Sequence, residues 1–256
     1  MSMPRRRGFT LGGRLRIGAR IALLLVTLAV SLPAHFACRL FTRRSPMPRV
    51  FLGMVARIVG ARVRIVGIPL RREAFIVSNH VSWLDIPALA GATGTAFVAK
   101  AEAARVPIIG WLCRLNHTVF VDRGARLAVA SQIAAVRDAL MQNHAVTVFP
   151  EGTTGDGCSL LPFKSAILSV LDPPPPGVMV QPVLLDYGPA ASSLAWLGDE
   201  HGLDNALAVL ARRGTFPLTI RFLEPFSPAA LPGRKAIAAE TQARISAALA
   251  SALTAR

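Results

Sequence analysis

A histidine and an aspartate stand five positions apart in the segment Asn-His-Val-Ser-Trp-Leu-Asp, residues 79–85. The segment follows the apolar run 74–77, so it lies where an expected strand ends. There the imidazole of His80 can take a proton from a hydroxyl, while the carboxylate of Asp85 holds the other ring nitrogen. This is the chemistry of acyl transfer or hydrolysis. The pair alone also fits a structural role, in which Asn79 caps the next helix and Asp85 lies in its first turns.

A second polar segment, Phe-Pro-Glu-Gly-Thr-Thr at residues 149–154, follows another expected strand. A glycine lets the backbone approach a ligand closely, and the amides beside it can hold a polar or anionic headgroup. The alternative is an ordinary strand-to-loop turn with a solvated glutamate. The candidate binding residues here are Glu151, Gly152, Thr153 and Thr154.

Basic residues end three further segments: Arg123 after Phe-Val-Asp, Lys100 after Phe-Val-Ala and Lys164 after Leu-Pro-Phe. A fixed cation suits a phosphate or carboxylate. Taken singly, each is better explained as a solvated cation or, for Arg123, as the partner of Asp122. The apolar stretch 107–112 can border an acyl-chain groove, but core packing is its favoured interpretation.

The hydrophobic pattern indicates which elements position these residues. β-Branched runs bounded by turn residues predict strands at 62–67, 73–78, 96–99, 118–121, 145–149, 178–186 and 218–223. Helices are expected at 126–143, 163–171 and 234–255. Strands that alternate with helices predict an α/β fold with a mixed, largely parallel sheet, covered by helices and carrying functional loops at strand ends.

The net charge of +15 is confined to the N-terminal part of the chain. Fifteen arginines and no acidic residue precede Glu73, and the fourteen later basic residues balance all fourteen acidic ones. No aromatic interleaving or helix-turn-helix pattern accompanies the arginines, so a nucleic-acid-binding protein is disfavoured. Anionic lipid headgroups explain arginines beside an apolar helix more simply. We expect a basic N-terminal membrane anchor at 1–49 and one catalytic domain at 50–256.

The anchor contains the apolar stretch 21–38, which is marginal for the roughly 20 residues that span a bilayer. Arginines flank it on both sides, so a span, a re-entrant helix and a helix lying in the interface all remain open. A cleavable signal peptide is disfavoured, because Pro33, His35 and Phe36 occupy places where small residues are needed. Three cysteines without metal-site spacing favour a reducing compartment and predict no metal site.

Read in order, four blocks resemble the glycerolipid acyltransferase family, of the bacterial lysophosphatidate acyltransferase type. The blocks are Asn-His-x4-Asp at 79–85, Phe-Val-Asp-Arg at 120–123, Phe-Pro-Glu-Gly-Thr at 149–153 and Val-x-Pro-Val at 180–183. The resemblance also includes Phe-Val-Ala-Lys ending at Lys100 and Leu-Pro-Phe-Lys at 161–164, and it extends over about residues 60–225.

The resemblance implies that His80 is the general base and that Asp85 orients it, with no metal, cofactor or covalent acyl-enzyme. Arg123, Glu151 and Gly152 would position the headgroup of a lysolipid acceptor. The acyl donor would be an acyl carrier protein or coenzyme A thioester. The implied location is the inner membrane, with the catalytic domain facing the cytoplasm.

One departure concerns the acceptor. Many lysophosphatidate enzymes carry arginine after Phe-Pro-Glu-Gly-Thr, where it suits a phosphate monoester. Here Thr154 occupies that place and Asp156 follows, a pattern similar to the lyso-ornithine lipid acyltransferase branch. The expected product is ornithine lipid. The alternatives are a 1-acylglycerol-3-phosphate acyltransferase that makes phosphatidic acid and a non-catalytic lipid-binding protein of the same fold.

Overall fold

The computed structural model describes residues 9–42, 45–121, 129–142, 145–198 and 200–256. Its strands are β1 (Ala61–Val66), β2 (Ala74–Ser78), β3 (Ala96–Lys100), β4 (Val119–Val121), β5 (Ala145–Val148), β6 (Met179–Asp186) and β7 (Phe216–Phe222). They form one sheet in the order β1-β7-β6-β2-β5-β3-β4. Only β6 and β7 pair in the antiparallel sense among the described strands. The prediction of a mixed, largely parallel sheet is confirmed.

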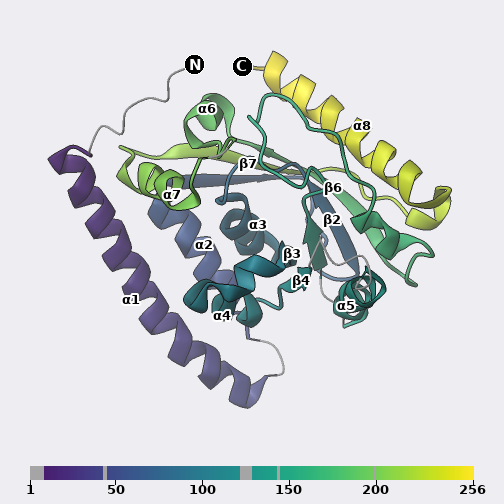
Figure 1. Ribbon diagram of the computed structural model, residues 1–256, viewed down its shortest axis with the longest axis horizontal. Coiled ribbons are helices and arrows are strands. Elements are labelled where there is room, and N and C mark those ends of the chain that lie inside the picture. The colour runs from purple at the N-terminus through teal and green to yellow at the C-terminus, as the bar shows by residue number, and fades with distance from the viewer. Residues whose placement is uncertain (1–8, 43–44, 122–128, 143–144, 199) are drawn as a thin grey trace.

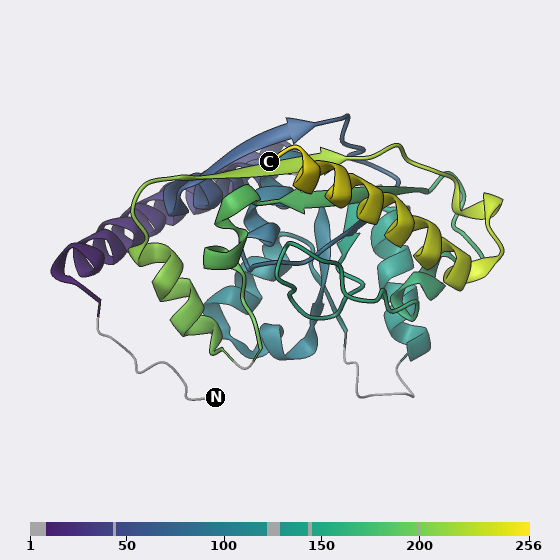
Figure 2. The ribbon, with the colours of Figure 1, turned by 90° about the horizontal axis from the view of Figure 1, so that it is seen from above.

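Helices cover both faces of this sheet (Figure 1). They are α1 (Leu11–Phe41), α2 (Met47–Val59), α3 (Asp85–Thr93), α4 (Pro107–Leu115), α5 (Val129–Met141), α6 (Ala191–Leu194), α7 (Gly202–Ala211) and α8 (Gly233–Thr254). Seen from above, α8 runs in front of the long strands (Figure 2). Helices α5 and α8 pack on one face of the sheet, and α2, α3 and α7 pack on the other. The fold is therefore a three-layered α/β structure.

Alternate residues of the central strand β2 point into two different cores. Ala74 and Ile76 pack with α2, α3 and α7 on one face, whereas Phe75 and Val77 pack with α5 and α8 on the other. A strand that is buried on both faces reads as a continuous apolar run, as Ala74-Phe75-Ile76-Val77 does. This double burial fixes the position of the segment that follows β2.

Two arginines of α1 form hydrogen bonds with the C-terminal end of α7, which engages their side chains within the protein. Arg16 donates from Nε to the carbonyl of Ala211 at 2.7 Å. Arg20 donates to the carbonyls of Val209, Leu210 and Arg212 at 2.9–3.1 Å. The last carbonyls of a helix lack partners within it, and a cation satisfies them while it complements the helix dipole. The lipid-headgroup interpretation is therefore wrong for these two arginines, which fasten α1 to the domain.

The structure corrects one expected helix and adds others. The helix expected at 163–171 is only a 3-10 helix at Ile167–Leu171. The first residues of the expected helix instead form a non-helical segment that is tied to its neighbours, because Phe163 donates to the Gln242 side chain of α8 and Lys164 to the carbonyl of Pro150. Four helices were not predicted, α2, α4, α6 and α7, and α1 extends beyond its apolar stretch at both ends.

Helices α2 and α3 touch at two glycines. A Cβ atom added at Gly91 would lie 2.5 Å from the Cα atom of Gly53, which is closer than two non-bonded carbon atoms can approach. The missing side chain therefore lets the two backbones pack directly. Because α3 begins at Asp85, this contact also bears on the candidate site.

We expect the Gly91→Ala substitution to destabilise the protein by about 1–3 kcal/mol, because α2 must move away from α3. The melting temperature of the detergent-solubilised protein should fall by about 3–8 °C. Gly18→Ala is the matched control: this helical glycine has nothing within 4 Å of the added Cβ, so the change should be neutral or stabilising. Equal melting temperatures for the two variants would contradict the close contact.

Candidate active site

Three neighbouring strand ends meet at the His80 segment. Strand β2 pairs in parallel with β5 on one side and with β6 on the other. The register places Val77 beside Val148 and Ser78 beside Val183. Parallel neighbours end at the same edge of a sheet, where polar loops gather. The residues after β2, β5 and β6 therefore share one site.

His80 and Asp85 are in contact, as the sequence predicts. Nδ1 of His80 lies 2.7 Å from Oδ2 of Asp85, whose side chain is fully buried, while the histidine side chain is 18% exposed. The same Oδ2 atom accepts hydrogen bonds from the amides of Val81 and Ser82 at 2.7 and 3.0 Å. Asp85 is also the first residue of α3, where the helix dipole favours a negative charge. The two amides and the helix dipole therefore hold the Asp85 carboxylate in place independently of its contact with the imidazole.

The other oxygen of Asp85 is bound by a residue that the sequence analysis missed. The hydroxyl of Tyr187 donates to Oδ1 at 2.5 Å, and Tyr187 is 1% exposed. Burial, followed by the nearby Asp85 charge, raises the pKa of Tyr187 well above its ordinary value, so the phenol stays protonated. The available signal was its position directly after the Val-x-Pro-Val strand, at the edge where the other polar residues gather.

Asn79 does not cap the following helix. Its amide donates to the carbonyl of Leu185 at 3.1 Å, and its carbonyl accepts from the amide of Leu185 at 2.8 Å. The side chain is buried and replaces a rung of the ladder between β2 and β6. It locks the residue before His80 to the residue two places before Tyr187.

Glu151 braces the histidine from the β5 side. Oε1 accepts the backbone amide of His80 at 2.9 Å, and Oε2 accepts the amide of Leu161 at 3.0 Å. The residue is 2% exposed, which excludes a solvated glutamate. Burial raises the pKa of Glu151, although the two backbone hydrogen bonds lower it in part. The carboxylate thus acts on the backbone that carries His80.

The loop after Glu151 is closed by its own polar residues. Gly152 has a positive φ of 75° at the turn, and Thr153 is exposed. The hydroxyl of Thr154 donates to the carbonyl of Trp196. Asp156 accepts the amides of Cys158 and Ser159 at 2.8 Å, and the Cys158 bond is the first cause of its lowered pKa. Thr154 and Asp156 therefore shape this loop.

The expected cations are not assembled around His80 in the described part of the chain. Lys100 is exposed at the end of β3, which β5 separates from β2. Lys164 is also exposed. Arg123 lies outside the described residues. The described residues also contain no cluster of metal-binding side chains.

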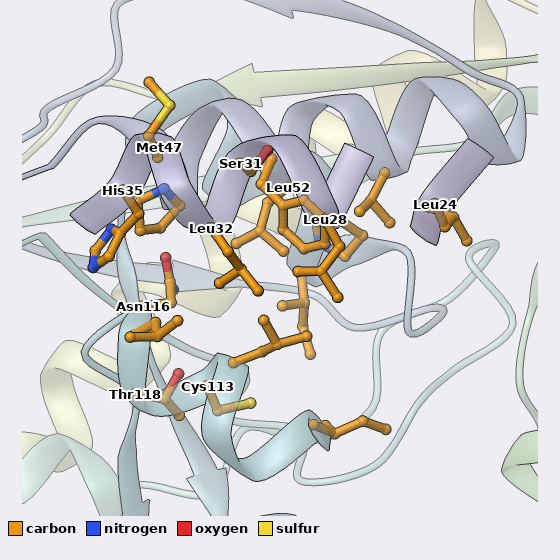
Figure 3. Close-up of a pocket in the computed structure, with 18 of the residues that line it drawn as sticks. Leu24, Leu28, Ser31, Leu32, His35, Met47, Leu52, Cys113, Asn116 and Thr118 are labelled. Carbon is orange, nitrogen blue, oxygen red and sulfur yellow. The ribbon is translucent and has the colours of Figure 1, made fainter. Parts of the chain in front are cut away.

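An apolar cavity of about 460 Å³ (Figure 3) is lined in part by Trp83 and Ile86, which lie on either side of Asp85 in the chain. Its walls come from α1, α2, α4, the start of α3 and β3, and include Leu24, Leu28, Leu32, Trp83 and Phe97. The ring of His80 stacks on Phe149 at 4.1 Å, and Phe149 stacks on Phe97 at 6.1 Å between centroids. This row of rings joins the histidine to the cavity wall.

Helix α4 contradicts the core interpretation of residues 107–112. Ile108 is 66% exposed and Ile109 55%, while Ile109 and Leu112 line the cavity. The alternative of an apolar groove is the one that the structure matches. The contribution of α1 to this groove was not visible in the sequence, because Leu24 and Leu112 are far apart along the chain.

Comparisons with known proteins agree with this arrangement. Residues 62–186 match the family model described as Acyltransferase. The chain is 34% identical over 229 residues to a Brucella abortus protein named lyso-ornithine lipid O-acyltransferase, covering 82% of this chain and 84% of that protein. It is 37% identical over 113 residues to the 1-acyl-sn-glycerol-3-phosphate acyltransferase of Neisseria gonorrhoeae, covering 44% and 43%.

The fold is also that of a solved structure, the 1-acyl-sn-glycerophosphate acyltransferase PlsC from Thermotoga maritima. The TM-score is 0.65 at 23% identity, covering 94% of this chain and 98% of the other. The family model and the relatives that match over most of their length lead to one conclusion. The chain belongs to the acyltransferase family and is an acyltransferase.

Proposed function

We propose that His80 is the general base in the transfer of a fatty acyl chain to the hydroxyl of a lysolipid. The observation that carries this is the 2.7 Å hydrogen bond from His80 to a fully buried Asp85. With Nδ1 engaged, Nε2 takes the hydroxyl proton, and Asp85 stabilises the imidazolium that forms. The lipid oxygen attacks the thioester carbonyl, and the departing thiolate recovers the proton from His80.

The apolar cavity is the proposed site of the acyl chain. Its walls are almost wholly hydrocarbon, and the ring row Phe97–Phe149–His80 places its side wall beside the base. An acyl chain in this cavity leaves water for an apolar surface, which stabilises it by about 0.8 kcal/mol per buried CH₂. The thioester carbonyl would then stand next to His80. An acyl carrier protein or coenzyme A thioester is the proposed donor.

The proposed acceptor is lyso-ornithine lipid. Several relatives that match over about four fifths of this chain carry that name. The loop supports it as well, because Thr154 and Asp156 add no cation where a phosphate monoester would need one. Arg123, Lys100 and the amides around Gly152 and Thr153 remain the proposed contacts of the headgroup. Lysophosphatidate is the alternative acceptor.

The proposed location is the inner membrane, with the catalytic domain on the cytoplasmic side. Helix α1 is long and apolar enough to cross a bilayer. However, it is fastened to α7 by Arg16 and Arg20 and lines the cavity with its later residues, so it runs along the domain. We therefore favour a helix that lies in the interface, with exposed side chains such as Val26 and Val30 in the lipid.

The position of α1 along the domain affects the proposed division of the chain into an anchor and a catalytic domain. Residues 1–49 would anchor the protein and residues 50–256 would carry the acyltransferase domain, although α2 begins at Met47 and joins the two parts. Helix α4 would enter the same interface through Ile108. The cavity between α1 and α4 would then open where the lysolipid resides.

The His80→Ala variant is expected to lose acyl transfer by at least about 100-fold, because it lacks the imidazole that takes the hydroxyl proton. The assay measures transfer from a labelled acyl carrier protein thioester to lysolipid in detergent micelles. His201→Ala is the control, since His201 is exposed and outside the site. A folded His80→Ala protein with normal activity would overturn the assignment of His80 as the general base.

Lyso-ornithine lipid and lysophosphatidate should differ as acceptors when assayed side by side. We expect kcat/KM to favour lyso-ornithine lipid by about tenfold or more, and Thr154→Arg to raise the relative use of lysophosphatidate by supplying a cation. Thr154→Val removes the same hydrogen bond to Trp196 without adding charge, so it should leave the ratio unchanged. Exclusive use of lysophosphatidate by the unmodified protein would refute the assignment.

A charge introduced on α4 should weaken membrane binding. Ile108 is 66% exposed and does not line the cavity, so Ile108→Glu is expected to reduce binding to phospholipid vesicles several-fold with little change in stability. Met141→Glu is the control, because Met141 is 58% exposed on α5 at the opposite face of the sheet. Equal vesicle binding by both variants would argue against the proposed orientation.

A further inference from the structure

The two oxygens of the Asp85 carboxylate have unequal partners. Oδ2 accepts from the His80 ring and from the amides of Val81 and Ser82. Oδ1 accepts the hydroxyl of Tyr187 at 2.5 Å. Both side chains are buried, at 0% and 1% exposure, so water cannot take the place of the phenol. The hydrogen-bonding need of Oδ1 is therefore met by the hydroxyl of Tyr187.

The hydroxyl of Tyr187 is placed by the sheet and not by a mobile loop. Tyr187 follows β6 directly, and Asn79 clamps Leu185 of β6 to the end of β2 through two hydrogen bonds. The ring lies 6.2 Å from the ring of Phe216 on β7, between centroids. The distance from Tyr187 to Asp85 is therefore set by the same strands that position His80.

We propose that Tyr187 is a positioning residue of the acyl transfer: its hydroxyl fixes the rotation of the Asp85 carboxylate and, through it, the orientation and basicity of His80. This inference rests on the proposed role of His80 as the base. The arrangement is a chain of three side chains, from phenol to carboxylate to imidazole, contributed by the ends of β6 and β2 and the start of α3.

The direction of the effect follows from the charges around the imidazole. In the described part of the chain, the titratable groups near His80 are Asp85, Glu151 and, through Asp85, Tyr187. A phenol that donates to the carboxylate withdraws charge from it. Without that donor Asp85 becomes more basic and stabilises the imidazolium more strongly. The base then stays protonated to a higher pH.

The Tyr187→Phe variant should therefore show two changes. The acidic limb of the pH profile of kcat/KM should move upward by about half a pH unit. At the pH optimum kcat should fall about tenfold, because the freed carboxylate rotates, while KM for the lysolipid stays the same. Phe216→Leu is the control: it disturbs packing against the same ring but leaves the hydroxyl in place, so the pH profile should not move.

A second measurement uses the fact that Tyr187 is the one tyrosine in the 256 residues. Growth on 3-fluorotyrosine labels this position alone and makes the phenol a more acidic, stronger donor. The acidic limb should then move downward, opposite to Tyr187→Phe. Opposite shifts cannot come from a loss of packing, so they distinguish a role in the relay from a structural one.

The outcomes separate this inference from the proposed function. If His80→Ala is inactive but Tyr187→Phe and the fluorotyrosine protein both keep the normal pH profile and kcat, the positioning role is refuted and the base assignment stands. If His80→Ala retains activity, the proposed function itself fails. Opposite shifts of the acidic limb together with an inactive His80→Ala variant support both.

Discussion

A fully buried carboxylate at Asp85 is the constraint on which the site depends. An ionised group out of contact with water is tolerated only when donors surround it. Here the donors come from the His80 ring, two backbone amides and the Tyr187 hydroxyl. These donors belong to separate segments that follow β2 and β6. The hydrogen bonds to one carboxylate therefore fix the ends of two strands and the start of α3 relative to one another.

The segments around this carboxylate serve mainly to hold the backbone of His80 in place. Glu151 accepts the amide of His80, and the amide of Gly155 donates to the carbonyl of His80 at 2.7 Å. The conspicuous Phe-Pro-Glu-Gly-Thr block thus first braces His80, the proposed base. A base that is held rigidly loses little energy to reorganisation during proton transfer, which favours catalysis at a fixed site.

The basic N-terminal part of the chain has a double role. Arg20 satisfies carbonyls at the end of α7, while the leucines one and two turns further along α1 line the apolar cavity. Helix α1, which we propose lies in the membrane interface, also forms a wall of the cavity and would place the lipid surface next to the site. Net charge alone indicated an anionic surface, but it did not show which arginines were already engaged within the protein.

The sequence by itself determined the local facts: the strands, including the doubly buried β2, the spacing of His80 and Asp85, and the family blocks in order. These depend on periodicity and short-range geometry, which neighbouring residues encode. Only the tertiary structure decided that Tyr187 binds Asp85, that Asn79 joins β2 to β6 and that Glu151 accepts the amide of His80. Each of these contacts joins residues 71 or more positions apart, and only sheet order and register bring such residues together.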